Sequence, residues 1–211
     1  MRITYLKSVD STQTYLKKLL QEKKVEIPHA VIADIQTNGV GSRDNTWNGM
    51  DGNLFLSFVI SLDDLPRDLK LESSSIYFAY LLKDVLTNLN SSVWLKWPND
   101  FYIKDKKIGG MITNVVDNYL VCGVGLNLVN SPKEFEKLDI NICKYELLKL
   151  YLQNIEKKYL WKQVFSKYKL EFYRNQNFYT HSNNEKISLC DAKLSADGSL
   201  EINGERIYGL R

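Results

Sequence analysis

The sequence predicts an α+β fold, in which a mixed or antiparallel sheet packs against helices and a small β module follows. Three observations predict it. Residues 101–129 read as consecutive strands joined by short turns. The segments 71–89 and 142–175 repeat apolar residues at the spacing of a helix. Residues 184–211 hold short strand-like runs separated by turn signals, which is typical of a miniature barrel.

The first part of the chain alternates strand and helix. Apolar and polar side chains alternate over residues 3–6, which predicts a short strand. Asp10 or Ser11 is a good N-cap, and the residues after it predict a helix that ends before Pro28. Residues 30–35 predict a second strand, which leads into a long glycine-rich loop.

The middle of the chain supplies most of the predicted sheet. Residues 53–61 are strongly apolar and predict a central strand. Residues 93–97 predict another strand, which Pro98 ends. The dipeptides at 105–106 and 117–118 mark the turns of an antiparallel meander.

The last part of the chain changes character. Asp-Gly at 197–198 and Asn-Gly at 203–204 are typical of hairpin turns between short strands. We therefore expect two domains, a main domain over residues 1–180 and a small β domain over residues 184–211.

Composition excludes several classes of protein. The net charge of +3 is too small to be a nucleic-acid signature. Cys122, Cys143 and Cys190 are far apart, so we expect neither a disulfide framework nor a zinc site, and a cytoplasmic protein fits best. His29 and His181 are the only histidines, and we expect no metal site built from protein ligands. No apolar run reaches the roughly 18 residues of a membrane span, and no signal-peptide core opens the chain.

The common nucleotide-binding motifs are absent. GxxxxGK[ST] does not occur, and GVGSRD and GVGLNL both lack the last glycine of GxGxxG. The loop from Gln36 to Asn53 has four glycines but one basic residue, Arg43. A plain surface loop is an equally good interpretation of it.

Four other stretches point to a ligand site, each with a structural alternative. DSTQT at 10–14 places hydroxyl and N–H groups at a helix start, where a simple cap is the alternative. KWPND at 96–100 places a lysine at the end of an apolar strand, where an edge-strand lysine is the alternative. KIGG at 107–110 and GVGLN at 123–127 place glycines inside strands, which indicates close ligand approach or a bulge. Together they suit a site that activates an acid, with a floor, a cation and a lid.

The ordered set of motifs resembles the biotin protein ligases. DST, Q-x-x-G-x-G-x-R-x-x-x-W, NL-x-L-S, KWPND, KIGG and G-x-G-x-N follow one another over roughly residues 3–130, and the terminal module is similar to the family's small SH3-like domain. The resemblance implies a class II synthetase-like core and a reaction with ATP and Mg²⁺. Biotin would form biotinyl-5′-AMP and then pass to a lysine of the biotin carboxyl carrier protein of acetyl-CoA carboxylase.

The resemblance also implies roles for individual residues. Lys96 and Arg43 would be catalytic, with Lys96 beside the biotin carboxylate and the α-phosphate. The implied biotin site comprises Ser11, Thr12, Gln13, Gln36, Gly39, Val40, Gly41, Ser42, Lys96, Gly123 and Gly125. The implied ATP site comprises Arg43, Asn45, Trp47, Lys107, Asn127 and Arg211.

The glycine-rich loop departs from the family pattern. The usual GRGRxGRxW is rich in arginine, whereas this chain has Val40, Ser42 and Asn45 at three of the arginine positions. We therefore expect Arg43 and Lys96 to carry most of the charge directed at the phosphate.

Two alternative functions and two expectations about DNA and self-association complete the predictions. A lipoate–protein ligase or octanoyl transferase would have the same core fold but lacks KWPND, and a non-catalytic biotin-binding module is the other alternative. Some relatives carry an N-terminal DNA-binding domain, but here the first predicted strand begins at Ile3, so no DNA binding is expected. Pairing at a sheet edge would allow a homodimer.

Overall fold

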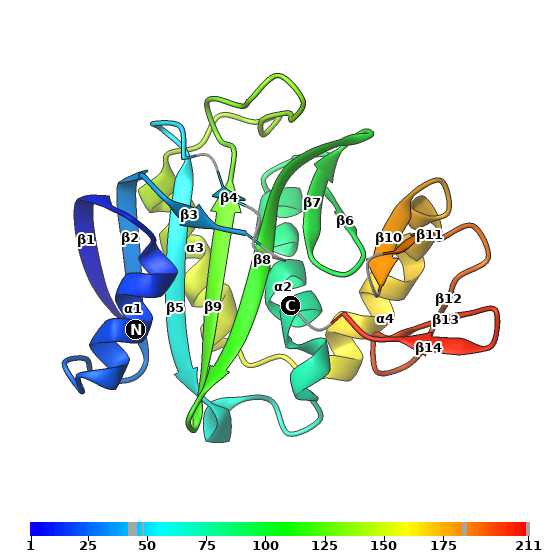
Figure 1. The fold of residues 1–211 in the computed structure, drawn as a ribbon, viewed down its shortest axis with the longest axis horizontal. Helices are drawn as coiled ribbons and strands as arrows, with labels where there is room; N and C mark the ends of the chain where they lie inside the picture. The colour runs from blue at the N-terminus through cyan, green and yellow to red at the C-terminus, as the bar shows by residue number, and fades with distance from the viewer. Residues whose placement is uncertain (42–45, 48, 183–184, 210–211) are drawn as a thin grey trace.

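The structure is a computed structural model and describes residues 1–41, 46–47, 49–182 and 185–209. A seven-stranded sheet forms its centre (Figure 1). From one edge to the other the strands are β1 (Arg2–Val9), β2 (His29–Gln36), β5 (Leu54–Ser61), β9 (Tyr119–Leu126), β8 (Lys106–Val116), β7 (Asp100–Ile103) and β6 (Trp94–Lys96). β1 and β2 are parallel and all other neighbours are antiparallel, so the predicted mixed sheet is confirmed.

Helices cover both faces of this sheet. α1 (Thr12–Gln21) lies on one face, and α2 (Ser74–Asn88) and α3 (Lys144–Glu156) lie on the other (Figure 1). Two single-turn helices, η1 (Leu62–Asp64) and η2 (Leu71–Ser73), precede α2. Within the described ranges, no helix is both long and apolar enough to cross a membrane.

The two faces of the sheet bury separate hydrophobic cores. In β5, Phe58 points to the α2–α3 face and packs edge-on against Phe78 and Tyr151, with ring centroids 5.4 and 5.9 Å away. Its neighbour Val59 points the opposite way and belongs to a small cluster under α1. That cluster comprises Leu16, Leu20, Val31, Val59 and Val121. β5 is apolar on both faces because it is covered on both, as expected for a central strand.

The turns of the meander lie close to their predicted positions. The β8–β9 turn occupies residues 117–118 as predicted, and Asp117 has a φ of +51°. The β7–β8 turn occupies residues 104–105, one residue before the predicted dipeptide, and Lys104 has a φ of +52°. Strand β6 is also shorter than predicted and ends at Lys96.

The predicted helical segment 142–175 is divided into α3, α4 (Trp161–Glu171) and the short helix η3 (Phe172–Asn175). The break has a tertiary cause. The carboxylate of Asp68 accepts hydrogen bonds from the backbone N–H groups of Trp161 and Lys162, at 2.8 and 3.1 Å. Because this side chain caps a new helix start, α4 begins there instead of continuing α3.

The tail forms two small sheets beside the main one. β10 (Tyr179–Ser182) pairs with β11 (Glu185–Ser188), and β12 (Lys193–Leu194), β13 (Leu200–Ile202) and β14 (Glu205–Ile207) form the second sheet. Both predicted hairpin turns are present. The first tail strand begins at Tyr179, before the predicted boundary, and tail residues such as Leu200 and Ile207 belong to the main core. The division into two domains stays a prediction.

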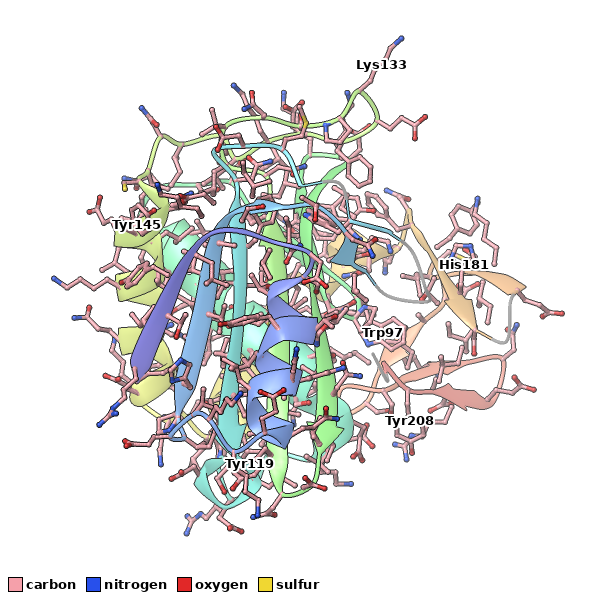
Figure 2. The ribbon with its side chains drawn as sticks, turned by 60° about the vertical axis from the view of Figure 1, so that its left-hand side comes forward. Trp97, Tyr119, Lys133, Tyr145, His181 and Tyr208 are labelled. Atoms are coloured by element: carbon pink, nitrogen blue, oxygen red, sulfur yellow. The ribbon has the colours of Figure 1, made fainter. Side chains whose placement is uncertain are left out.

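Three side chains of the main part hold the turn between β12 and β13. The indole N–H groups of Trp161 and Trp97 donate to the carbonyls of Ala196 and Gly198, both at 2.8 Å, and the Ser73 hydroxyl donates to the carbonyl between them. Figure 2 shows Trp97 between the main sheet and the tail strands. The tail is thus docked by specific hydrogen bonds.

Candidate active site

A pocket lies on the face of the sheet that α1 covers. On that face of β5 and β9, Val59 and Val121 pack under α1, whereas Ser57, Gly123 and Gly125 line the pocket. Ser57 and Gly123 are register partners, so they lie side by side. Small residues therefore replace apolar side chains where the helix begins, and the pocket occupies the space that they leave.

The start of α1 forms a polar end of the pocket. The backbone N–H and the hydroxyl of Thr12 both donate to Oε1 of Gln36, each at 2.9 Å. The Thr12 hydroxyl has a single proton, so at the 2.9 Å contact with Ser57 it is Ser57 that donates. Ser11 caps the helix by accepting from the N–H of Thr14. The structure thus brings Ser11, Thr12 and Gln36 together at one end of the pocket.

Gln13 forms one wall of the pocket and is held by residues outside the pocket lining. Its Nε2 donates to Oδ1 of Asn114 at 3.0 Å, and Nζ of Lys17 donates to the same oxygen at 2.9 Å. A Cβ atom on Gly123 would lie 3.3 Å from Cδ of Gln13, so this side chain fills the space above the glycine. Burial lowers the pKa of Lys17.

Trp47 forms the opposite wall. Part of the glycine-rich loop is a hairpin of β3 (Gly39–Val40) and β4 (Thr46–Trp47). A Cβ atom on Gly125 would lie 2.7 Å from both Cε2 and Nε1 of Trp47, so the indole lies directly over that glycine. Phe135 packs edge-on against the indole. The buried Nε1 of Trp47 has no hydrogen-bond partner among the described residues.

The glycines therefore serve a purpose that the sequence did not reveal. We expected Gly123 and Gly125 to let the sheet backbone approach a ligand, but Gln13 and Trp47 occupy the space over them. Gly39 has a similar role, because a Cβ atom there would lie 2.5 Å from Nε2 of Gln36. These glycines admit protein side chains that shape the pocket.

A charged cluster forms the other end of the pocket. Asp100 and Lys107 line it, and Nζ of Lys107 lies 2.6 Å from Oδ1 of Asp100. Nζ of Lys96 lies 3.9 Å from Oδ2 of the same carboxylate and 5.7 Å from the ring centre of Tyr102. Burial, with a smaller contribution from Asp100, raises the pKa of Tyr102. Lys96 itself is not among the residues that line the pocket and adjoins it through Asp100.

Seven lining residues were given no role from the sequence, and three of them, Ser57, Asn99 and Asp100, have polar side chains. Ser57, Asn99 and Asp100 belong to the motifs NL-x-L-S and KWPND, but only Lys96 was assigned a role there. Nδ2 of Asn99 donates to the carbonyl of Met111, while its buried Oδ1 has no partner among the described residues. The motifs themselves were the signal for these residues.

Asn127, predicted to contact the nucleotide, is buried away from the pocket lining. Its Nδ2 donates to the carbonyl of Glu136 at 3.1 Å, and its Oδ1 accepts from Nδ2 of Asn53 at 3.3 Å. Asn53 in turn accepts three backbone N–H groups from residues 128–130. In this structure Asn127 thus holds the loop that carries Phe135 to Trp47.

The remaining predicted residues divide into two groups. Val40 and Gly41 line the pocket, with Val40 half exposed. Ser42, Arg43, Asn45 and Arg211 lie outside the described residues.

The arrangement suits a ligand with two different ends. The hydroxyl and amide groups at the start of α1 can hold a neutral polar head, and the lysine pair can stabilise an anion. No group of three or more potential metal ligands is present in the part of the chain that the structure describes. The pocket therefore suits an acid with a polar head, together with a second anionic reactant.

Comparison with known proteins agrees with this geometry. Residues 5–127 match the Biotin/lipoate A/B protein ligase family. The bifunctional ligase/repressor BirA of Escherichia coli is 31% identical over 133 residues, which are 60% of this chain and 40% of BirA. The biotin–[acetyl-CoA-carboxylase] ligase of Mycobacterium tuberculosis is 27% identical over 111 residues, 50% of this chain and 41% of that protein. The matched segments thus span about two fifths of these relatives.

Solved structures match over the whole chain. Biotin acetyl coenzyme A carboxylase synthetase from Helicobacter pylori, solved with bound biotinylated ATP, is 38% identical with a TM-score of 0.94, covering 98% of this chain and 99% of that chain. Biotin protein ligase from Aquifex aeolicus in complex with biotin and ATP has a TM-score of 0.79 at 23% identity, covering 100% and 96%. The second likeness supports the fold alone.

Proposed function

Because this chain belongs to the biotin/lipoate A/B protein ligase family, we propose that it ligates biotin to a lysine of a carrier protein through biotinyl-5′-AMP, with ATP as the second substrate. The observation that carries the proposal is one pocket with a neutral polar end, Thr12–Gln36–Ser57, and a cationic end at Lys107, which Lys96 adjoins through Asp100. The 38% identity to the Helicobacter pylori synthetase supports it.

The polar end favours biotin over lipoate. The ureido ring of biotin has a carbonyl acceptor and two N–H donors, whereas the dithiolane ring of lipoate has neither. Ser11, Thr12, Gln36 and Ser57 are all buried polar residues on the pocket lining. Apolar sulfur atoms against them would leave polar groups without water or ligand partners, at about 1–3 kcal/mol for each such group.

In the first step, the biotin carboxylate oxygen attacks the α-phosphorus of ATP. The new P–O bond forms as the bond to pyrophosphate breaks, and negative charge develops on the phosphoryl oxygens. Lys96 and Lys107 would stabilise this charge, with Arg43 as a further cation. Loss of one such donor typically slows a reaction by about 10²–10³-fold.

In the second step, the ε-amine of the carrier lysine attacks the carbonyl carbon of the mixed anhydride. The amide bond forms as the bond to AMP breaks, and the amine releases its proton. Lys96, beside the same phosphate, would stabilise the departing AMP.

Mg²⁺ would enter bound to the phosphates of ATP. Such Mg²⁺ ions keep several waters and take one or two protein carboxylates at most. Asp100 is the acidic side chain on the described pocket lining, and its oxygens already pair with lysines. The residues therefore fit a metal held mainly by the nucleotide, which would neutralise phosphate charge.

The proposed carrier is the biotin carboxyl carrier protein of acetyl-CoA carboxylase. The names of the Helicobacter pylori and Mycobacterium tuberculosis relatives support this choice. We also propose a cytoplasmic location, because Cys122, Cys143 and Cys190 are all free thiols. The small net charge of +3 supports the proposal that DNA is not a partner. β1 is an edge strand and is the proposed contact of a homodimer, which sedimentation would test.

Pyrophosphate exchange and carrier labelling test the reaction. The wild-type protein should exchange pyrophosphate into ATP when biotin is added, and not when lipoate or octanoate replaces it. It should then label a purified carrier domain. Exchange with lipoate but not biotin would favour lipoate ligation, and binding of biotin without exchange would favour a non-catalytic module.

Lys96→Ala tests the proposed catalytic cation. We expect a folded protein with exchange reduced by about 10²–10³-fold. Lys83→Ala is the matched control: Lys83 and Lys96 have the same side-chain exposure of 11%, each pairs with a carboxylate, and each lies over a tyrosine ring. The Lys83 pair lies away from the pocket, so this control should keep its activity. Near wild-type exchange by Lys96→Ala contradicts the assignment.

A further inference from the structure

We propose that Asp100 is a positioning residue, whose carboxylate holds the ammonium groups of Lys96 and Lys107 on either side of one point on the pocket wall. The proposal rests on the function proposed above, because it concerns the cations of that reaction. The sequence places Asp100 in the KWPND motif but does not say what its carboxylate contacts. The strand register and the distances from its two oxygens to Lys107 and Lys96 show these contacts.

The register places the cluster on one face of the sheet. Lys96 pairs with Asp100 across β6 and β7, and Asp100 pairs with Gly110 across β7 and β8. Tyr102 follows Asp100 by two residues and therefore points to the same side. Register partners share a face, so Lys96, Asp100 and Tyr102 all point toward the pocket side of the sheet.

A β-bulge brings Lys107 to that face. The pairing shifts after Phe101, which lies opposite Gly109, to Tyr102, which lies opposite Lys107. Ile108 is therefore the extra residue. Residues 107 and 110 would point to opposite faces of a regular strand, because side chains alternate. The bulge removes one alternation, so Lys107 joins Asp100 on the pocket face.

Gly110 gives the ion pair its space. A Cβ atom there would lie 3.1 Å from Oδ1 of Asp100 and 3.5 Å from Nζ of Lys107. The first distance is tighter than most Cβ contacts and the second is an ordinary van der Waals contact, so a side chain at this position would press on the Asp100 carboxylate. The second glycine of KIGG therefore serves the Asp100–Lys107 contact.

The charges explain why a carboxylate is needed. Two ammonium groups close together repel each other, and each lysine stem has many rotamers. Asp100 has one oxygen 2.6 Å from Lys107 and the other 3.9 Å from Lys96, which offsets the repulsion. An ammonium group has three donors, and the contact with one oxygen of Asp100 does not use all three in either lysine. Asp100 thus prearranges two cations before the anion enters.

Asp100→Asn tests the inference by separating binding from chemistry. It keeps the size of the side chain and removes its charge. We expect kcat for biotin-dependent adenylation to fall by about 10–10²-fold, because a misplaced catalytic group costs that much. KM for ATP should stay within about 3-fold, because both lysines still attract phosphate. Asp100→Glu, which keeps the charge, should recover part of kcat.

Combining Asp100→Asn with Lys107→Ala supplies a second readout. If Asp100 acts through the lysines, the double variant should lose less than the product of the two single losses. Glu171→Gln is the matched control: Glu171 pairs with Lys83 at 2.8 Å and its side chain is 15% exposed, against 16% for Asp100. It should leave kcat unchanged.

The outcomes are distinguishable. An inactive wild-type protein overturns the proposed function and this inference with it. An active wild-type protein with a normal Asp100→Asn variant overturns the inference alone. If Asp100→Asn raises the Mg²⁺ concentration needed for half-maximal rate, Asp100 acts on the metal. If Glu171→Gln loses as much kcat as Asp100→Asn, the loss reflects stability. Either result overturns the inference.

Discussion

Replacing Gly125 by alanine places a methyl carbon 2.7 Å from Cε2 and Nε1 of Trp47. Carbon atoms in contact normally lie about 3.5–4.0 Å apart, so the two groups would overlap by about 0.8 Å or more. Gly125 lies in β9, which is paired on both sides by β5 and β8, so its backbone cannot retreat. Trp47 belongs to a two-stranded hairpin and is half buried. The indole therefore has to move.

Two opposing effects set the change in the free energy of unfolding caused by Gly125→Ala. Overpacking of this kind costs about 1–3 kcal/mol. Alanine in a strand offsets about 0.5–1 kcal/mol of that, because glycine loses more backbone freedom on folding. Gly125→Ala should therefore lower the free energy of unfolding by up to about 2.5 kcal/mol. With Trp47→Ala in the same chain, the overlap disappears and Gly125→Ala should stabilise the protein by about 0.5–1 kcal/mol.

Urea unfolding of the four proteins in this double-mutant cycle measures the coupling directly. We expect a coupling energy of about 1–3 kcal/mol between the two positions. Gly123→Ala is the control on the same strand and face; its Cβ atom would meet its neighbours at 3.3–3.4 Å, so its smaller effect should not depend on Trp47. If the two substitutions add within about 0.3–0.5 kcal/mol, the indole does not lie over Gly125 in solution.

Three further predictions concern stability. Burial lowers the pKa of the His29 imidazole in the folded protein, so the unfolded chain binds a proton at this position more readily. The free energy of unfolding should therefore fall as the pH drops below about 6.5. In urea unfolding, His29→Gln should flatten this pH dependence. Asn175→Leu removes the acceptor of the buried backbone N–H of Trp97, which lies 2.7 Å from Oδ1 of Asn175, and should cost about 1–3 kcal/mol in thermal unfolding. A loss below about 0.5 kcal/mol contradicts this prediction. Gly198→Ala and Gly204→Ala both place alanine at a positive φ, but only the first places a Cβ atom 2.8 Å from an isoleucine of α2. Gly198→Ala should therefore destabilise the protein by about 1–3 kcal/mol more than Gly204→Ala. Equal losses would show that the β12–β13 turn does not pack against α2.

Local chemistry made much of the fold predictable. The Ser11 cap, the hairpin turns of the tail and the mixed sheet follow from rules that act over a few residues. The division between α3 and α4 did not, because its cause is Asp68, which lies 93 residues before Trp161. Within residues 142–175 the local contribution is Gln163, whose side chain accepts from the backbone N–H of Leu160 at 2.9 Å.

The candidate site divides in the same way. Motif spacing brought Thr12 and Gln36 to one end of the pocket. It did not predict that Lys96 would adjoin the pocket through Asp100, because that depends on pairing between β6 and β7. It also did not predict the bulge at Ile108, since an extra residue in a strand is visible only once its partner is known.

The unpartnered indole of Trp47 has a spectroscopic consequence. Trp94, Trp97 and Trp161 each donate the indole N–H to a backbone carbonyl, so their surroundings are fixed by the protein. Trp47 is the fourth tryptophan, and its N–H faces no acceptor in the described part of the chain. A ligand that enters the pocket changes the polarity around this fluorophore and leaves the other three as a constant background. Intrinsic emission should therefore report occupancy of the pocket through a single residue, without any label.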